Sequence, residues 1–354
     1  MTGPFGIWQH ALGVAPDESY GTCTDDVARA LTVDLLHQRP IGWKAVSRST
    51  QRSLAFLVAA FNPATGSFRN FRGADGAWLD EQGSQDTQGR ALLAIGGAVR
   101  DIPDAVMRLE AQSLLLAALP GARRLTSPRA LASAILGCDA ALSGGMRGEA
   151  ERTFAFLVRR LRMSFSDLDL DGDWPWPEET LTYENALLPH ALIVAGVRLG
   201  DGRLRSVGLT VLDWLIEIQT SRRGTFTPIG NDGWWTRGGE RSRFDQQPIE
   251  ATALILAAAV AYDATQDAGY RRAAEAAYGW FLGDNDAGHA VADVVTGGCH
   301  DGLAQDGVNV NQGAESTLMW LTALETMRQL RTRAMPVHGQ QVLGGKPVLV
   351  AVRA

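Results

Sequence analysis

The stretch DQQPIEATALILAAAVAY, residues 245–262, joins a polar, acid-bearing segment to a run that is apolar on nearly all sides. Such a run predicts a helix that is buried all round. Working outward along the chain, five further segments have the same order of a polar head followed by an apolar run. The six copies are CTDDVARAL (23–31), SQDTQGRAL (84–92), LTSPRAL (125–131), TYENALLPHAL (182–192), DQQPIEATAL (245–254) and NQGAESTL (311–318).

The copies recur at a nearly regular spacing. When Ala30, Ala91, Ala130, Ala191, Ala253 and Thr317 are taken as equivalent positions, the steps are 61, 39, 61, 62 and 64 residues. A period of this kind holds one helical hairpin, and a repeated hairpin predicts a fold built from equivalent units. Amphipathic runs, which are typical of outer helices, lie between the copies at residues 47–61, 105–119, 149–162, 204–219 and 270–283.

The two classes of helix predict an all-α fold, an (α/α)6 toroid with six inner helices. The inner helices are expected to begin, all at one end, near Asp25, Asp86, Ser127, Glu184, Pro248 and Gln312. Five outer helices are clear, so we expect the outer ring to be incomplete or to be completed by the N-terminal stretch. No Pro/Gly/Ser linker divides the chain, which predicts one domain over residues 1–333 and a C-terminal tail over residues 334–354.

Composition and charge exclude several classes of protein. The net charge is −6 and the basic residues are scattered, which argues against a nucleic-acid partner. The N-terminal stretch has neither a basic n-region nor an apolar h-region, and no uncharged apolar run reaches the roughly 18 residues of a membrane span. We therefore expect a cytoplasmic protein. Three widely spaced cysteines predict neither a disulfide framework nor a zinc cluster.

Five of the six polar heads carry acidic side chains, and the heads are expected to meet at one rim. Each carboxylate can simply cap a helix N-terminus. Several at one rim can also supply the protonated and the ionised carboxyl group that cleavage of a glycosidic bond requires. The acidic residues of the heads are Asp25, Asp26, Asp86, Glu184, Asp245, Glu250 and Glu315.

Two polar loops place tryptophans beside these heads. Trp174 and Trp176 precede the fourth head, and Trp234 and Trp235 follow Asp232 before the fifth. Indoles can stack on the apolar faces of sugars, although they also pack beneath long loops. Hydrogen-bonding side chains accompany them, namely Asn185, Asn231, Arg241, Gln246, Gln247, His300, Asn309, Asn311 and Gln312. This combination predicts a pocket for a neutral oligo- or polysaccharide.

Several long stretches of the chain have a distinctive sequence. They are GTCTDDVARAL (21–31), WLDEQGSQDTQGRALLAIG (78–96), DWPWPEETLTYENALLPHALI (173–193), GNDGWWTRGGERSRFDQQPIEATALI (230–255), WFLGDNDAG (280–288) and TGGCHDGLAQDGVNVNQGAESTLMWLTAL (296–324). Together they resemble, over residues 15–330, the bacterial helical domain often fused C-terminal to group 1 glycosyltransferases. That domain is similar to the six-hairpin (α/α)6-barrel glycosidases, whose active sites lie where the inner helices begin.

The resemblance implies a glycosyltransferase as a partner and a site at the same rim. The implied site residues are Asp25, Asp26, Asp86, Tyr183, Glu184, Asn185, Asp232, Arg241, Asp245, Gln246, Gln247, Glu250, Asp301, Asn311, Gln312 and Glu315. No Gly-rich strand-to-helix turn of a Rossmann domain is present, so the sequence favours cleavage of a sugar chain over synthesis from a sugar nucleotide.

We therefore expect an inverting glycoside hydrolase. The general acid is predicted to be Glu250, because neighbouring carboxylates would raise its pKa. The candidate bases are Glu184, Asp232 and Glu315, and Asp25 is a further catalytic candidate. The pocket is expected to be walled by Asp232, Trp176 and Trp235.

Other activities stay open. A sugar epimerase, a lyase or a phosphorylase on the same barrel is the second interpretation. Epimerases of this shape depend on paired histidines, which the rim lacks, and Arg237, Arg241 and Arg243 keep an acidic sugar open as the substrate of a lyase. The remaining alternative is a protein without catalytic activity, a sugar-binding module that serves a glycosyltransferase.

One segment has the spacing of a calcium loop, with oxygen ligands at Asp167, Asp169, Asp171 and Glu178. Pro175 and Pro177 argue against it, because they occupy the end where an exiting helix should begin. The scattered histidines predict no catalytic zinc. Beyond this weak calcium candidate, no metal or cofactor is expected.

Overall fold

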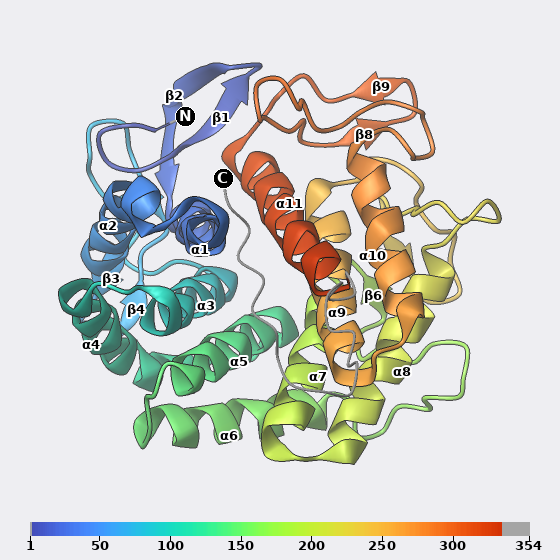
Figure 1. Ribbon diagram of the computed structural model, residues 1–354, viewed down its shortest axis with the longest axis horizontal. Helices are drawn as coiled ribbons and strands as arrows, with labels where there is room; N and C mark the ends of the chain where they lie inside the picture. Colours follow the sequence, from blue (N-terminus) through green and yellow to red (C-terminus); the bar gives the residue numbers. More distant parts are fainter. Residues whose placement is uncertain (1, 335–354) are drawn as a thin grey trace, which may run out of the picture.

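Six inner helices form a closed ring. The computed structural model describes residues 2–334 of the chain. The inner helices are α1 (Thr24–Ile41), α3 (Gln85–Asp101), α5 (Pro128–Ser143), α7 (Leu187–Leu199), α9 (Pro248–Thr265) and α11 (Ala314–Ala334), and each begins within three residues of its predicted start. Each contacts the next in this order, and α11 returns to contact α1 (Figure 1). The predicted (α/α)6 toroid is confirmed.

Five outer helices alternate with the inner ones along the chain. They are α2 (Trp43–Ala60), α4 (Ala105–Ala122), α6 (Glu149–Met163), α8 (Gly202–Ile218) and α10 (Ala268–Phe281). Each packs against the inner helix that precedes it. Residues 2–334 contain no twelfth helix, so the outer ring is incomplete within the described part of the chain. The predicted tail, apart from its first residue, lies outside the described residues.

The N-terminal stretch forms a β-hairpin, which the sequence analysis did not predict. Strands β1 (Trp8–Leu12) and β2 (Ala15–Cys23) pair antiparallel, and β5 (Phe71–Arg72) adds a third strand beside β2. Residues 2–7 precede the hairpin and line, together with α1, α2 and α11, a cavity of about 680 Å³. The N-terminal stretch therefore covers part of the gap between α11 and α1 without completing the outer ring.

The long loops before the inner helices carry short two-stranded ladders. These are β3 (Phe61–Asn62) with β4 (Ser67–Phe68), β6 (Thr180–Leu181) with β7 (Trp235–Thr236), and β8 (Leu303–Ala304) with β9 (Gly307–Val308). The β6–β7 ladder joins the loop before α7 to the loop before α9. We call the end of the toroid at which the six inner helices begin the rim.

Helices α3 and α5 pack backbone against backbone. A Cβ on Gly96 would lie 2.0 Å from the carbonyl oxygen of Gly137, and one on Gly137 would lie 2.3 Å from the carbonyl oxygen of Leu92. No side chain fits at either position, so glycine sets the distance between these two helices. Around them, buried apolar residues from Val27 to Leu330 form one contiguous cluster.

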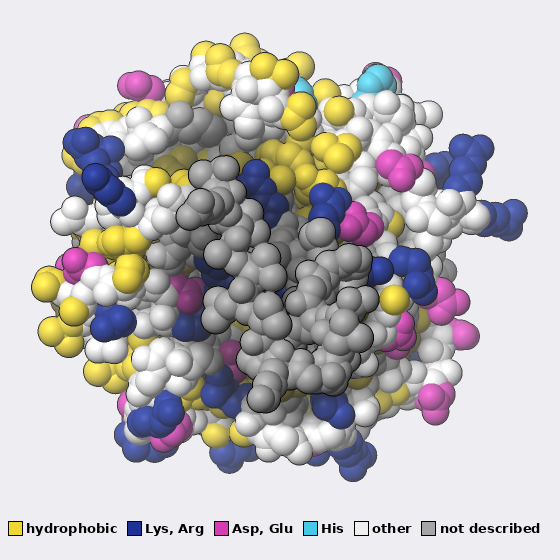
Figure 2. Space-filling view, viewed as in Figure 1, with side chains coloured by type: hydrophobic (Ala, Val, Ile, Leu, Met, Phe, Trp, Pro, Cys, Tyr) yellow, Lys and Arg dark blue, Asp and Glu magenta, His cyan; other side chains and the backbone are white. Residues whose placement is uncertain are grey.

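Charged side chains of both signs lie on the surface, and the long apolar helix α9 lies in the core. Where side chains are coloured by type in Figure 2, Lys and Arg are interspersed with Asp and Glu. Among the described residues, α9 is long and apolar enough to cross a membrane by length and composition, but 67% of it is buried inside the protein. That burial is what its place in the inner ring requires.

The close approach of α3 and α5 predicts a position-specific loss of stability. Gly96→Ala should lower the free energy of unfolding by about 1–3 kcal/mol, because the new Cβ overlaps the backbone of α5. Gly97→Ala is the matched control, since its Cβ would come no nearer than 3.3 Å, to a methyl group of Leu35. Alanine also favours the helix by up to about 1 kcal/mol there. Urea denaturation followed by circular dichroism measures both, and equal losses would contradict this packing.

Candidate functional site

Arg90 gathers carboxylates from three of the polar heads. Its guanidinium lies 3.4 Å from Asp25, 3.0 Å from Glu184 and 4.0 Å from Asp86. Burial alone would lower the pKa of Arg90, but these carboxylates and that of Glu315 together raise it. The heads of α1, α3 and α7 therefore meet in a charge cluster that is centred on Arg90.

A second arginine joins the heads of α1 and α11. Arg29 lies 3.0 Å from Asp26 and 2.5 Å from Glu315. Arg29 and Asp26 are buried, whereas the side chain of Glu315 is 46% exposed. Burial raises the pKa of Asp26 to about 6, although Arg29 opposes that rise.

The turn before α7 presents two side chains to this cluster. The hydroxyl of Tyr183 donates to Asp86 at 2.5 Å, and the carboxylate of Glu184 accepts from Arg90. Burial, followed by the hydrogen bond to Asp86, raises the pKa of Tyr183, so this phenol is a neutral donor. Ser127, the N-cap of α5, lies 3.4 Å from the other oxygen of Asp86.

Glu250 lies behind this turn. Its side chain is buried, and its two oxygens accept from the backbone N–H of Glu184 and from the side-chain amide of Asn185. Burial raises the pKa of Glu250 to about 7, and the backbone N–H groups of Glu184 and Asn185 together with Arg129 moderate the rise. Arg129 holds the same turn from α5, because it donates to the carbonyl oxygen of Tyr183 and to Asn185.

A cavity of about 290 Å³ opens at the centre of the rim. Its size is at the lower end of the roughly 300–1,000 Å³ typical of small-molecule sites. Its lining comes from four of the six polar heads and the loop before α9, and consists of Ser84, Asp86, Arg90, Tyr183, Asn231, Gln247, Ile249 and Glu315. The cavity is therefore walled by two carboxylates, a guanidinium and neutral hydrogen-bonding groups.

The predicted catalytic residues differ in their relation to this cavity. Glu315 lines it. Glu184 and Asp25 do not line the cavity and are paired with Arg90, which does. Glu250 is buried and contacts the backbone of Glu184. Asp232 is exposed, beside the lining residue Asn231. One pocket was predicted for all these carboxylates. The carboxylates that line the cavity are those of Glu315 and of Asp86, which was predicted as a binding residue.

The prediction that Trp174 and Trp176 face a ligand is wrong. Their side chains are 7% and 2% exposed, and the indole of Trp174 packs edge-on against Trp214 and Trp235 while it donates to the carbonyl oxygen of Glu178. The Pro-containing loop folds back on the core and buries both rings. Trp235 is half-buried, so the wall expected from it and Trp176 is not formed.

Trp234 is the tryptophan of these loops that stays accessible. It is 36% exposed, has a φ of +54°, and its indole donates to Asn231 at 2.8 Å. Because Asn231 lines the cavity, Trp234 lies next to the site and not in its wall.

Most of the other predicted binding residues hold the loops together. Asp301 accepts from Asn311 and from the N–H of Gly313, and Asn311 lies 3.0 Å from His10, which ties β1 to the start of α11. His300 and Gln312 lie 3.4 Å apart in the same cluster, where His300 also reaches the carbonyl oxygen of Asn309. These residues therefore position α11 and do not line the cavity.

The loop before α9 is braced in the same way. Gln246 is buried between Asp286 and Trp280, and Arg241 donates to the carbonyl oxygens of Ile218 and Thr227. Burial, then the nearby carboxylates of Asp301 and Asp232, raise the pKa of Asp245. Of the residues predicted in this loop, Asn231 and Gln247 reach the cavity. Arg241 is therefore not free to bind an acidic sugar.

The calcium-loop spacing does not assemble a cation site. Glu178, its twelfth position, lies 2.8 Å from Arg129. Within residues 2–334, no group of three or more His, Cys, Asp or Glu side chains is arranged to hold a metal ion. Glu178 instead balances the charge of Arg129.

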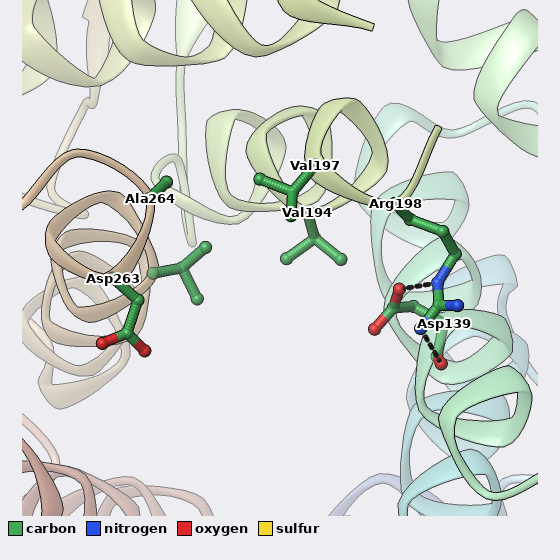
Figure 3. A pocket seen from close by; sticks show the side chains of 7 residues that line it. Asp139, Val194, Val197, Arg198, Asp263 and Ala264 are labelled. Atoms are coloured by element: carbon green, nitrogen blue, oxygen red, sulfur yellow. Dashed lines mark hydrogen bonds and ion pairs between the residues drawn. The ribbon is translucent and has the colours of Figure 1, made fainter. Parts of the chain in front are cut away.

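A second cavity lies at the opposite end of the toroid from the rim. It has a volume of about 300 Å³ and lies where α5, α7 and α9 end (Figure 3). Valines make up much of its wall, and Arg198 is paired with Asp139. Asp263, its other charged lining residue, is paired with Arg333 of α11. The charged groups of this cavity are thus engaged in ion pairs, and the site described above is the better candidate for chemistry.

The sequence analysis missed the three arginines that organise the rim. Arg29, Arg90 and Arg129 each stand directly before the alanine that marks the repeat, in the tripeptide Arg-Ala-Leu. A charged residue repeated at the same position of an otherwise apolar helix was the available signal. It indicates a buried ion pair because an unpaired charge is rarely buried.

No family model matches the chain, and no curated protein sequence does. Solved structures share its fold. A sugar epimerase from a ruminal bacterium has 12% identity over 94% of this chain and 93% of its own, with a TM-score of 0.73. Cellobiose 2-epimerase from Spirochaeta thermophila has 13% identity over 94% of this chain and 92% of its own, with a TM-score of 0.69. A GH76 α-mannanase from Bacteroides thetaiotaomicron has 9% identity over 88% of this chain and 87% of its own, with a TM-score of 0.60. These likenesses show the shared (α/α)6 architecture.

The charge cluster predicts a large cost for removing Arg90. Arg90→Met should lower the free energy of unfolding at pH 7.5 by about 3–5 kcal/mol, because several carboxylates lose a buried counter-charge. Unpaired carboxylates in the folded state have raised pKa values, so the variant should recover stability as the pH falls from 7.5 to 5. Arg331→Met, which breaks a surface pair with Glu275, is the control and should cost less than about 1 kcal/mol. Urea unfolding at several pH values measures both, and similar costs would contradict the role of Arg90.

Proposed function

We propose that this protein is a carbohydrate-active enzyme that hydrolyses a glycosidic bond with carboxyl groups at the rim. The observation that carries the proposal is that Asp86 and Glu315 line one cavity together with Arg90 and neutral hydrogen-bonding side chains. Acetal hydrolysis requires one carboxylic acid to protonate the leaving oxygen and one carboxylate to activate water or attack carbon. A cavity with two carboxyl groups from different helices can supply both.

The surroundings of the two carboxyl groups favour different roles. Asp86 accepts hydrogen bonds from Tyr183 and Ser127, which fix the orientation of its carboxyl group and suit a base that must be aimed at a water molecule. Glu315 is paired with Arg29, but its side chain is 46% exposed, so it is the better placed to reach a substrate oxygen. We assign Glu315 as the acid and Asp86 as the base, and we retain an inverting reaction, which requires room for a water molecule between them.

Glu250, which was predicted to be the general acid, is too deeply buried for that role. Its carboxyl group is buried beneath Glu184, and both of its oxygens accept hydrogen bonds from N–H groups. A general acid has to come within hydrogen-bond reach of the substrate oxygen.

A sugar epimerase is the second candidate. Epimerases occur among the proteins with this fold, and a cavity of about 290 Å³ suits a single sugar ring as well as the end of a chain. Against it, the cavity lining contains no histidine. Product analysis separates the two, because hydrolysis releases a shorter sugar and epimerisation conserves mass.

Asp86 and Glu315 are both expected to be essential for turnover. Asp86→Asn and Glu315→Gln should each lower turnover by about 10²- to 10⁴-fold with the fold retained, because each removes a proton-transfer group. Glu275→Gln, at the surface of α10, is the control and should leave turnover unchanged. The measurement is sugar release from a panel of α- and β-linked gluco-, manno- and galacto-oligosaccharides. Near-normal turnover in both site variants would refute the assignment, and tight binding without turnover by the parent protein would favour a binding module.

The charge balance of the site predicts its preference among sugars. Asp25, Asp26, Asp86, Glu184 and Glu315 face two guanidinium groups, Arg29 and Arg90, so the carboxylate of a uronic acid would add to an excess of negative charge. We expect glucuronate-terminated oligosaccharides to bind at least about tenfold more weakly than the matched glucose-terminated ones. Calorimetric titration of the matched pair measures the ratio. Tighter binding of the uronate would restore the acidic-sugar interpretation.

A further inference from the structure

The turn that presents Tyr183 and Glu184 to the cavity is strained. Glu184 has a φ of +50°, in the left-handed region that residues with a side chain rarely adopt. Within residues 2–334, the other non-glycine residues with positive φ are Trp234, beside the site, and Gln266, at the end of α9. A residue held in this region raises the free energy of the folded state and persists because its surroundings hold it there.

Glu250 supplies much of that hold. Its two oxygens accept from the N–H of Glu184 and, at 3.3 Å, from the side-chain amide of Asn185. The orientation of Asn185 is fixed in turn, because its oxygen accepts from Arg129 and from the N–H of Thr182. The side-chain nitrogen of Asn185 therefore donates to the carbonyl oxygen of Thr182 and to Glu250. A carboxylate, which has acceptors and no donor, matches both partners, whereas a protonated carboxyl group matches one.

The same turn delivers the side chains that face the cavity. Tyr183 donates to Asp86, and Glu184 pairs with Arg90. A shift of the turn would move both contacts, and displacement of a catalytic group by about 1 Å can cost about 10²-fold in rate. The carboxyl group of Glu250 thus acts on the cavity through the backbone of its neighbour.

We propose that the ionised carboxylate of Glu250 is a positioning group that holds the strained turn of residues 182–185, so that the site is assembled when Glu250 is ionised and loosened when it is protonated. The charged groups that face it are Arg129 from α5, which favours the ionised form, and Glu184 from the turn, which opposes it. The pKa of Glu250, about 7, sets the transition near neutral pH. The effect on turnover depends on the proposed function, but the holding of the turn does not.

The pH profile of the full-length protein distinguishes a positioning carboxylate from a general acid. If Glu250 positions the turn, kcat/KM of the parent enzyme falls on the acidic side with an apparent pKa near 7. A general acid at Glu250 would give the opposite sign, with activity lost as the pH rises through 7. In Glu250→Gln the acidic limb should disappear and the plateau should drop by about 10²-fold. A parent profile that falls on the alkaline side, with that limb absent in Glu250→Gln, overturns the proposal.

Hydrogen exchange tests the same inference without a substrate. In the parent protein, protection of residues 182–186 should decrease below pH 7 after correction for the intrinsic pH dependence of exchange. In Glu250→Gln, protection should be low at every pH. Glu325→Gln removes an equally buried carboxyl group about 15 Å further along α11 from Glu315, and should leave this segment unchanged. If Glu250→Gln does not fold, Glu250→Asp replaces it and should show a shifted transition. Exchange that is independent of pH and of residue 250 refutes the inference, even if the enzyme hydrolyses sugars.

Discussion

The guanidinium of Arg90 is the interaction on which the rim depends. It draws together the carboxylates of Asp25, Asp86 and Glu184, which would otherwise repel one another. Arg29 extends the connection from α1 to α11, and Arg129 extends it from α5 to the turn before α7. Glu250 adds α9 through the same turn, so charges and hydrogen bonds link the beginnings of all six inner helices. Within this network, Asp86 and Glu315 line one cavity together.

The repeat explains why the charges lie on one side of the ring. The position before the marker residue holds arginine in α1, α3 and α5, but His190, Thr252 and Ser316 in α7, α9 and α11. Burial lowers the pKa of His190 to about 4, so it is neutral, and Thr252 donates to a carbonyl oxygen of α11. The hairpin unit thus provides a common scaffold, while divergence at one equivalent position confines the cationic groups to half of it. Carboxylates from α1, the turn before α7 and α11 pair with these cationic groups.

The sequence predicted the fold better than the site, for identifiable reasons. Helix periodicity and polar heads are local signals, so the eleven helices and their starts could be predicted. The N-terminal hairpin was missed because neither strand alternates regularly between buried and exposed residues. Trp176 and Glu250 were placed in the correct segments, but composition does not tell whether a side chain points to a cavity or into the core. Tertiary packing sets the direction of each side chain, and it buries both Trp176 and Glu250.

Burial and function place opposite demands on the acids of the rim. In the folded protein the pKa of Asp26 is raised to about 6 and that of Glu250 to about 7. Because both values lie above those of the unfolded chain, the folded state binds more protons between about pH 4 and pH 7, and these groups stabilise the fold less as the pH rises. The hydrogen bonds to Glu250 are nevertheless made for a carboxylate. The protein therefore gives up stability at neutral pH to keep this group charged, on the order of 1.4 kcal/mol for each pKa unit. A buried carboxylate retained at such a cost is better explained by the strained turn it holds than by the stability of the fold.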